Sequence, residues 1–293
     1  VESADLVIGE TTCDGKKKAY ELLGEYAPVY VMELPQMKRP QDLAFWREEL
    51  DRLVEKLEEV TGNTLTFEAL QKATKEVNDK RRALQRLNAA RAASPAPISG
   101  KDALLAVQVA FYDDVPRFTE MVNKIADELE QRVASGKGVA TADAPRVLIT
   151  GTPMSVPNWK VHDIVEKAGG VVVAEEMCTG SRYYDKLVSE DATTLEGAMD
   201  ALAVKYLDVN CACFTPNQGR IDDVLRMAKE YKADGVLHYA LQFCATYQIE
   251  ATTVERSAQE AGLPVLRVDT DYSMEDVGQL STRVEAFLEM LKA

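Results

Sequence analysis

The stretch Val147-Leu148-Ile149-Thr150-Gly151 is an apolar, β-branched run that ends in glycine, which is typical of a buried strand. An amphipathic segment from Asn158 to Ala168 follows it and is closed by Gly169-Gly170. A second apolar run, Val171-Val172-Val173-Ala174, comes directly afterwards. A strand, a helix and a strand in this order form a βαβ unit, whose strands are parallel. This stretch therefore predicts a parallel sheet covered by helices.

The same alternation continues to the end of the chain. Strands are predicted at 235–239 and 265–268. Helices are predicted at 195–206, 217–232, 249–261 and 275–292. Strands that alternate with helices of this length indicate a doubly wound α/β architecture. We therefore predict a C-terminal, flavodoxin-like α/β lobe over residues 141–293.

The N-terminal residues repeat the pattern on a smaller scale. A strand is predicted within residues 4–12, a helix begins after Cys13, and a second strand is predicted at Val29–Met32. The chain starts at Val1, without the basic and apolar regions of a signal peptide, as though it began inside a fold. Residues 1–40 are therefore interpreted as the remnant of an N-terminal α/β lobe whose upstream part is missing.

Residues 41–140 follow a helical period instead. Apolar residues recur at positions such as Leu43, Trp46 and Leu50, which predicts amphipathic helices. The run Lys80-Arg81-Arg82 is interpreted as a solvated helix face, the alternative being contact with an acidic partner or with phosphate groups. The predicted fold class is thus α/β, with two doubly wound parallel-sheet lobes and a helical layer between them.

Composition excludes two classes of partner. The chain has 48 acidic and 34 basic residues, a net charge of −14, which disfavours binding to nucleic-acid phosphates. No apolar run approaches the ~20 residues that span a bilayer. The five cysteines are an odd number and no secretory signal is present, so reduced thiols and a cytoplasmic location are predicted.

The positions of the cysteines carry the chemical information. Cys13, Cys178 and Cys244 each follow a predicted strand, and Cys211 and Cys213 lie in a loop before a predicted helix. Ligands of doubly wound sheets bind where the carboxyl ends of the strands meet, so we expect the thiols to converge there. Paired zinc knuckles are absent, and widely spaced single cysteines suit a [4Fe–4S] cluster better. Ordinary reduced thiols remain the alternative.

Several sequence strings occur here in the order found in a known superfamily. They are Gly9-Glu10-Thr11-Thr12-Cys13-Asp14-Gly15-Lys16-Lys17-Lys18, Cys178-Thr179-Gly180-Ser181-Arg182-Tyr183, Asp234-Gly235-Val236 with Gln242-Phe243-Cys244, and Asp269-Thr270-Asp271-Tyr272 with Thr282-Arg283-Val284-Glu285-Ala286-Phe287. The chain resembles the 2-hydroxyacyl-CoA dehydratase and benzoyl-CoA reductase subunit superfamily over essentially its whole length. The string around Cys13, together with residues 210–217, most resembles the double-cubane cluster protein branch.

The resemblance implies an iron–sulfur cluster held between two α/β lobes. Cys13 and Cys244 match two of the three cysteines that hold a [4Fe–4S] cluster in dehydratase subunits. In the double-cubane branch an [8Fe–9S] unit needs more thiolates, for which Cys213, Cys211 and Cys178 are candidates. This sequence lacks the upstream cysteines of the family pattern.

The resemblance also implies an activity and partners. The double-cubane branch implies an anaerobic, homodimeric iron–sulfur oxidoreductase that reduces small molecules with electrons from an ATP-hydrolysing iron–sulfur activator. The alternative is a subunit of a radical 2-hydroxyacyl-CoA dehydratase, a lyase, paired with a homologous second subunit. Arg182 is a candidate anchor for an anionic substrate or a structural salt bridge. Hydrogen bonds to the cluster, or ordinary packing, are expected of residues near Cys244: His238, Tyr239, Gln242 and Tyr247.

Overall fold

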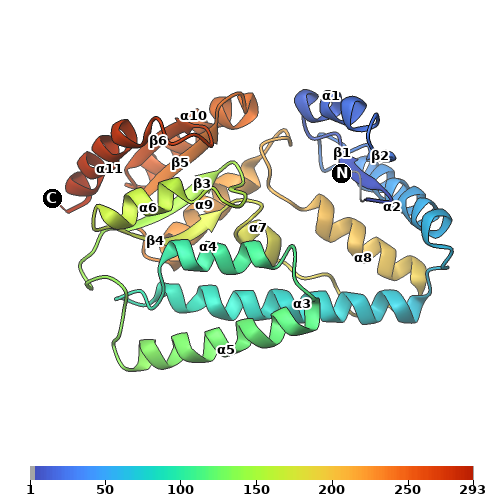
Figure 1. Cartoon of the computed structure of the whole chain (residues 1–293), viewed down its shortest axis with the longest axis horizontal. Helices are drawn as coiled ribbons and strands as arrows, with labels where there is room; N and C mark the ends of the chain where they lie inside the picture. Colours follow the sequence, from blue (N-terminus) through green and yellow to red (C-terminus); the bar gives the residue numbers. More distant parts are fainter. Residues whose placement is uncertain (1–3, 293) are drawn as a thin grey trace. The chain divides into compact units, whose positions relative to one another are not determined.

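The computed structural model describes residues 4–292, which form two compact units (Figure 1). The first unit contains the residues up to Lys75 together with Leu187–Asn217. The second contains Glu76–Lys186 and the residues from Gln218 onward. Cys13, Cys211 and Cys213 therefore belong to the first unit, and the other two cysteines belong to the second.

The second unit is built on a four-stranded parallel sheet with the order β4-β3-β5-β6. The strands are β3 (Arg146–Gly151), β4 (Val171–Glu176), β5 (Gly235–Leu241) and β6 (Val265–Thr270). The predicted α/β class with parallel strands is confirmed. Because all four strands run the same way, their carboxyl ends, and the loops that follow, lie along one edge.

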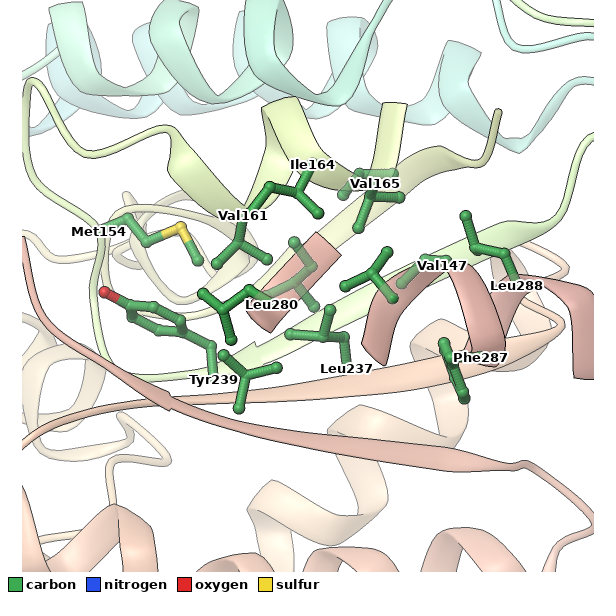
Figure 2. Close-up of a cluster of buried hydrophobic side chains, with 14 of the residues drawn as sticks. Val147, Met154, Val161, Ile164, Val165, Leu237, Tyr239, Leu280, Phe287 and Leu288 are labelled. Atoms are coloured by element: carbon green, nitrogen blue, oxygen red, sulfur yellow. The ribbon is translucent and has the colours of Figure 1, made fainter. Parts of the chain in front are cut away.

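Alternate residues of β3 face opposite sides of this sheet. Val147 and Ile149 pack into one apolar cluster, and Leu148 packs into another. The first cluster is closed by α6 (Lys160–Lys167) and α11 (Val277–Lys292), whose side chains meet those of the strands in Figure 2. The second is closed by α9 (Gln218–Glu230) and α10 (Ala245–Glu260). The period of two along the strand thus produces a sheet with helices on both faces.

Helix α10 begins earlier than the sequence pattern predicts. The apolar period suggests a start at Ile249, whereas the helix begins at Ala245, directly after Cys244. The carbonyl of Cys244 accepts the amide hydrogen of Gln248 at 3.1 Å, which closes the first turn. Cys244 is therefore the N-cap residue of this helix.

The remainder of the second unit is mainly helical. It contains α4 (Gly100–Val109), α5 (Val115–Ala134), the short α7 (Ser181–Tyr184), the 3₁₀ turn η1 (Ala90–Ala92) and most of α3 (Phe67–Ala89). Leu84 and Phe118 contribute to their common core. Ser99 caps α4, because its hydroxyl accepts the Asp102 amide hydrogen at 3.0 Å.

The prediction that the basic run of α3 is solvated is wrong for two of its three residues. Lys80 and Arg81 are buried, at 6% and 1% exposure. The Lys80 ammonium donates to the Ala110 carbonyl at 3.1 Å, and the Arg81 guanidinium donates to the Tyr183 carbonyl at 3.3 Å. These side chains satisfy backbone carbonyls from other segments, a role that periodicity along one helix does not reveal.

The first unit contains a two-stranded parallel sheet and three further helices. The elements are β1 (Val7–Glu10), α1 (Asp14–Leu23), β2 (Val29–Met32), α2 (Pro40–Thr61) and α8 (Leu195–Leu207). Trp46 of α2, Leu207 of α8 and Phe214 form its small core. No helix among the residues described here is both long and apolar enough to cross a membrane.

Gly151, at the end of β3, offers a test of this architecture. Its φ of +140° is unfavourable for other residues, and an added Cβ would lie 1.8 Å from the Tyr239 carbonyl oxygen on β5. We expect Gly151→Ala to lower the free energy of unfolding by about 3 kcal/mol, measured by urea denaturation. Gly262→Ala is the control, because Gly262 also has positive φ (+78°) but has open space around it; there we expect a loss of about 1–2 kcal/mol. Equal losses would contradict the steric argument.

Candidate functional site

Cys13 lies at the junction of β1 and α1. It is the N-cap residue of α1, it is exposed, and its carbonyl accepts the Lys17 amide hydrogen at 3.2 Å. The lysines that follow are paired with carboxylates, Lys16 with Glu10 and Lys17 with Asp14. Cys13 also lies at the N-terminus of α1, where the backbone N–H groups favour a negative charge.

The loop after β2 ties the two cysteine-bearing segments of the first unit together. The hydroxyl of Thr11, two residues before Cys13, accepts the Leu34 amide hydrogen at 2.9 Å. The carbonyl of Gln36 accepts the Thr215 amide hydrogen at 3.0 Å, and Thr215 follows Cys213 by two residues. Cys211 and Cys213 are half-buried and pack against the small core. All three cysteines of this unit thus lie in segments that hydrogen-bond to residues 34–36.

A cavity of about 530 Å³ opens at this edge. Its walls include Thr11, Lys17, Glu33 and Leu34. It therefore adjoins the segment that carries Cys13, where β1 and β2 both end. Small molecules that reach the edge have room here, as expected at the carboxyl ends of parallel strands.

In the second unit, Cys178 and Cys244 follow β4 and β5, the two neighbours of β3. Because the strands are parallel, both thiols follow carboxyl ends on the same edge. Both are half-buried. Cys244 repeats the arrangement of Cys13, since each follows a strand and is the N-cap residue of the next helix.

A buried charge network lies next to Cys178 and reaches the first turn of α10. The Glu176 carboxylate, at the end of β4, accepts hydrogen bonds from Arg182 at 2.5 and 2.8 Å and from Arg220 at 3.3 Å. The Thr150 hydroxyl donates to the same carboxylate at 2.5 Å. Glu176, Arg220 and Thr150 are at most 1% exposed. Two guanidinium groups therefore share one carboxylate out of contact with water.

Arg182 connects this network to the Cys178 thiol and to the first turn of α10, which Cys244 begins. One of its nitrogens lies 3.7 Å from the Cys178 sulfur and donates to the Tyr247 hydroxyl. Tyr247 lies in the first turn of α10, three residues after Cys244, and the Arg220 guanidinium lies 4.7 Å from its ring centre. The salt-bridge interpretation of Arg182 is supported, because its guanidinium is buried and directed at Glu176.

His238 on β5 completes the network. Its Nε2 faces a nitrogen of Arg220 at 3.3 Å and accepts a hydrogen bond from it. Burial, reinforced by the charges of Arg220, Arg267 and Arg182, lowers the pKa of His238 to about 3. The imidazole is therefore neutral in the folded protein at neutral and mildly acidic pH.

The neutral state of His238 has a consequence for stability. Below pH ~6.5 the unfolded chain binds a proton at this histidine and the folded chain does not. The free energy of unfolding therefore decreases as the pH is lowered from about 6.5 to about 3. We expect the slope to be about 1.4 kcal/mol per pH unit. His238→Gln keeps a hydrogen-bond acceptor but removes the titration, so its urea-unfolding free energy should lack this contribution. Parallel pH profiles for both proteins would refute the assignment.

The five cysteines fit the donor chemistry of an iron–sulfur cluster. Within residues 4–292 none of the five forms a disulfide, and all lie outside the helices and strands, at or near the edges described above. Within residues 4–292, no three His, Cys, Asp or Glu side chains are grouped so that they could hold a metal ion. The convergence of thiols from the two units stays a prediction.

Residues 1–291 match the family of the 2-hydroxyglutaryl-CoA dehydratase D-component, and the chain belongs to this family. Among similar proteins, the putative dehydratase subunit YjiM of Escherichia coli (strain K12) is 40% identical, over 98% of this chain and 74% of its own length. The (R)-phenyllactyl-CoA dehydratase beta subunit of Clostridium sporogenes is 27% identical, over 91% and 68%. A benzoyl-CoA reductase subunit of Thauera aromatica is 20% identical, over 76% and 56%. The predicted superfamily is thereby confirmed, and an enzyme-related role follows from these relatives.

Proposed function

We propose that this protein is an iron–sulfur oxidoreductase of the double-cubane type, which accepts low-potential electrons from an ATP-hydrolysing activator and reduces small molecules. The observation that carries the proposal is the repeated arrangement of Cys13 and Cys244, each a thiol that follows a parallel strand and begins a helix. Thiolates at helix N-termini are favoured by the helix dipole and are the ligands that iron–sulfur clusters use.

Cys13, Cys244, Cys213 and Cys211 are the ligands we propose. Cys211 and Cys213 add thiols in the same unit as Cys13, in segments held by the same loop, 34–36. These extra thiols favour a larger cluster, [8Fe–9S], over a single [4Fe–4S] cubane. When bound, the cluster supplies one-electron chemistry at low potential. The cavity of about 530 Å³ beside Thr11 and Lys17 gives a small substrate access to the edge that carries Cys13.

The buried network sets the environment of the thiols in the second unit. Arg182 places a positive charge 3.7 Å from the Cys178 sulfur, while Glu176 offsets part of the charge of the two arginines that it binds. Through Tyr247 the same network fixes the first turn of α10, which Cys244 begins. Hydrogen bonding and burial around the ligands are the means by which a protein tunes a cluster's potential.

A second candidate is a subunit of a radical 2-hydroxyacyl-CoA dehydratase that carries a [4Fe–4S] cluster. The names of two relatives, the (R)-phenyllactyl-CoA dehydratase beta subunit and the (R)-2-hydroxyglutaryl-CoA dehydratase beta subunit of Acidaminococcus fermentans, favour it. Both relatives are subunits, so this candidate implies a homologous partner subunit, whereas the double-cubane candidate implies a homodimer.

Iron and acid-labile sulfide, measured on protein purified without oxygen, test the proposal. We expect about eight irons per chain for the double-cubane type and about four for the dehydratase subunit. Calorimetric titration with 2-hydroxyacyl-CoA thioesters separates the candidates further, because only the dehydratase requires a thioester site. Protein without iron or sulfide, with no visible absorbance that dithionite bleaches, would contradict both.

A further inference from the structure

Residues 210–214, which contain Cys211 and Cys213, lie in the connection between α8 and α9. We call this segment the two-thiol turn. The Cys211 carbonyl accepts the Phe214 amide hydrogen at 3.1 Å and a side-chain amide hydrogen of Asn217 at 3.0 Å. Neither thiol belongs to a helix or a strand, so the positions of both depend on contacts with other segments.

One lysine from the loop between β2 and α2 contacts this turn at two points. The Lys38 ammonium donates to the Asn210 side-chain oxygen at 2.7 Å and lies 4.8 Å from the centre of the Phe214 ring. Asn210 directly precedes Cys211, and Phe214 directly follows Cys213. Asn210 and Phe214 are buried, at 8% and 4% exposure. A single cation therefore holds both ends of the two-thiol turn, through a charge-assisted hydrogen bond and a cation–π contact.

The backbone on either side of Lys38 is itself anchored. Two residues earlier, the Gln36 carbonyl accepts the Thr215 amide hydrogen at 3.0 Å. Directly after Lys38, the N-cap residue Arg39 donates to the Asp42 carboxylate from its backbone amide at 2.9 Å and from its guanidinium at 2.6 Å. The Lys38 side chain is 26% exposed, so most of it is covered. An anchored backbone and a covered stem lower the entropy cost of holding the turn.

The contacts of Lys38 also bring a positive charge to the turn. Its two contacts there are with an amide and with an aromatic ring, which are both neutral. The Asp208 carboxylate lies 4.0 Å from the ammonium and is 50% exposed, so water screens this ion pair. The charge is therefore not neutralised by the groups through which Lys38 holds the turn. Thiolate ligands make a cluster anionic, and the net charge around a cluster is one of the factors that set its reduction potential.

We propose that Lys38 is a positioning residue of the cluster site, which orders the two-thiol turn and places a positive charge beside Cys211 and Cys213. Ordering the turn needs no metal, so this part of the role exists in the metal-free protein. The effect of the charge rests on the proposed function, because it requires Cys211 and Cys213 as ligands. A nearby cation favours the reduced, more negative cluster and so raises its reduction potential.

Hydrogen exchange of the metal-free protein, followed by mass spectrometry, tests the ordering of the turn. Lys38→Met keeps the length of the side chain but removes the donor and the charge. We expect the amides of Phe214 and Thr215, which are hydrogen-bonded in the folded protein, to exchange about tenfold faster in this variant. That factor is the effect of losing one hydrogen bond to a charged group.

Two further variants make this measurement specific. Lys38→Arg keeps a cation and a donor, so it should keep most of the protection of these amides. Lys18→Met is the matched control, because it removes an exposed lysine of the same unit that pairs with Glu21. This variant should leave exchange in the two-thiol turn unchanged. Equal exchange in Lys38→Met and Lys18→Met would overturn the proposal.

A redox titration of protein loaded with iron and sulfide without oxygen tests the charge. We expect Lys38→Met to shift the midpoint potential to a more negative value and Lys18→Met to leave it unchanged. A purely structural role would lower the iron content without moving the potential, so a cluster retained by Lys38→Met with an unshifted potential would overturn the proposal. Loss of the cluster from Lys38→Met with retention by Lys38→Arg would support it, whereas loss from both variants would overturn it.

Failure of the proposed function gives a different result from failure of this inference. Unmodified protein that takes up no iron contradicts the proposed function, and hydrogen exchange then still decides whether Lys38 orders the turn. Unmodified protein that takes up iron, with exchange and potential both insensitive to Lys38→Met, contradicts only the role of Lys38.

Discussion

Glu176→Gln is expected to lower the free energy of unfolding by about 3 kcal/mol, because it leaves the buried Arg182 without its carboxylate partner and Arg220 paired with Glu250 alone. The carboxylate of Glu176 is the shared anion of Arg182 and Arg220, and all three side chains are at most 4% exposed. The amide keeps the size and one acceptor oxygen but carries no charge. Both guanidinium groups would then lie in a low-dielectric interior without a counter-charge from this position.

Urea denaturation measures this loss, and Glu120→Gln is the matched control. Glu120 pairs with Lys124 on the surface of α5, where both side chains are more than half exposed. We expect that variant to lose less than about 0.5 kcal/mol, because water screens exposed pairs. A similar small loss for Glu176→Gln would show that the two arginines are stabilised by other groups.

The parallel sheet was predictable because its signal is local. β3, β4 and β6 are short runs rich in β-branched residues, and the helical segments before β4 and β6 end at Gly169-Gly170 and Gly262. The prediction ended β4 at Ala174, whereas the strand continues through Glu175 and Glu176. Two acidic residues look like a loop in a sequence window. In the structure both are buried, Glu175 because Arg91 binds its two oxygens at 2.6 and 2.7 Å.

The arginine partners of Glu175 and Glu176 are too distant in the sequence to be identified from local sequence patterns. Arg91 and Glu175 are separated by 84 residues, and Arg220 and Glu176 by 44. Burial disfavours the charged form of Glu175, yet the Arg91 guanidinium lowers the pKa of that carboxyl to about 2. A pair of acidic residues at the end of an otherwise apolar strand is the one signal of this network that the sequence offers.

The candidate site was predictable in part. Loop positions for the cysteines follow from their places after apolar runs, and the structure confirms that all five lie outside regular elements. Which loops share an edge depends on strand order, and strand order is set by packing across the whole sheet. The order β4-β3-β5-β6 places the loops of Cys178 and Cys244 on either side of β3, which the sequence does not specify.

Cys13→Ala and Cys244→Ala are each expected to abolish most of the bound iron and sulfide in protein purified without oxygen. Each substitution removes a proposed thiolate ligand, and cluster assembly requires the full set of thiolates. Cys213→Ala and Cys211→Ala should also lower the iron content if the cluster is [8Fe–9S]. For a single [4Fe–4S] cluster these two variants should retain it, so this pair of results separates the two candidate functions.

Neighbouring threonines provide the controls for these substitutions. Thr12→Ala alters the residue next to Cys13, and Thr246→Ala alters the hydroxyl that lies 3.9 Å from the Cys244 sulfur. Both variants keep the thiols, so both should keep the iron. That result would exclude local disruption of the helix starts as the cause of iron loss in the cysteine variants.

The thiol positions at the N-caps of α1 and α10 carry no side-chain capping hydrogen bond. Replacing either cysteine by alanine should therefore change the urea-unfolding free energy of the metal-free protein by less than about 1 kcal/mol. Iron retained by Cys13→Ala and Cys244→Ala alike would refute their assignment as ligands, while the fold and the family would stand.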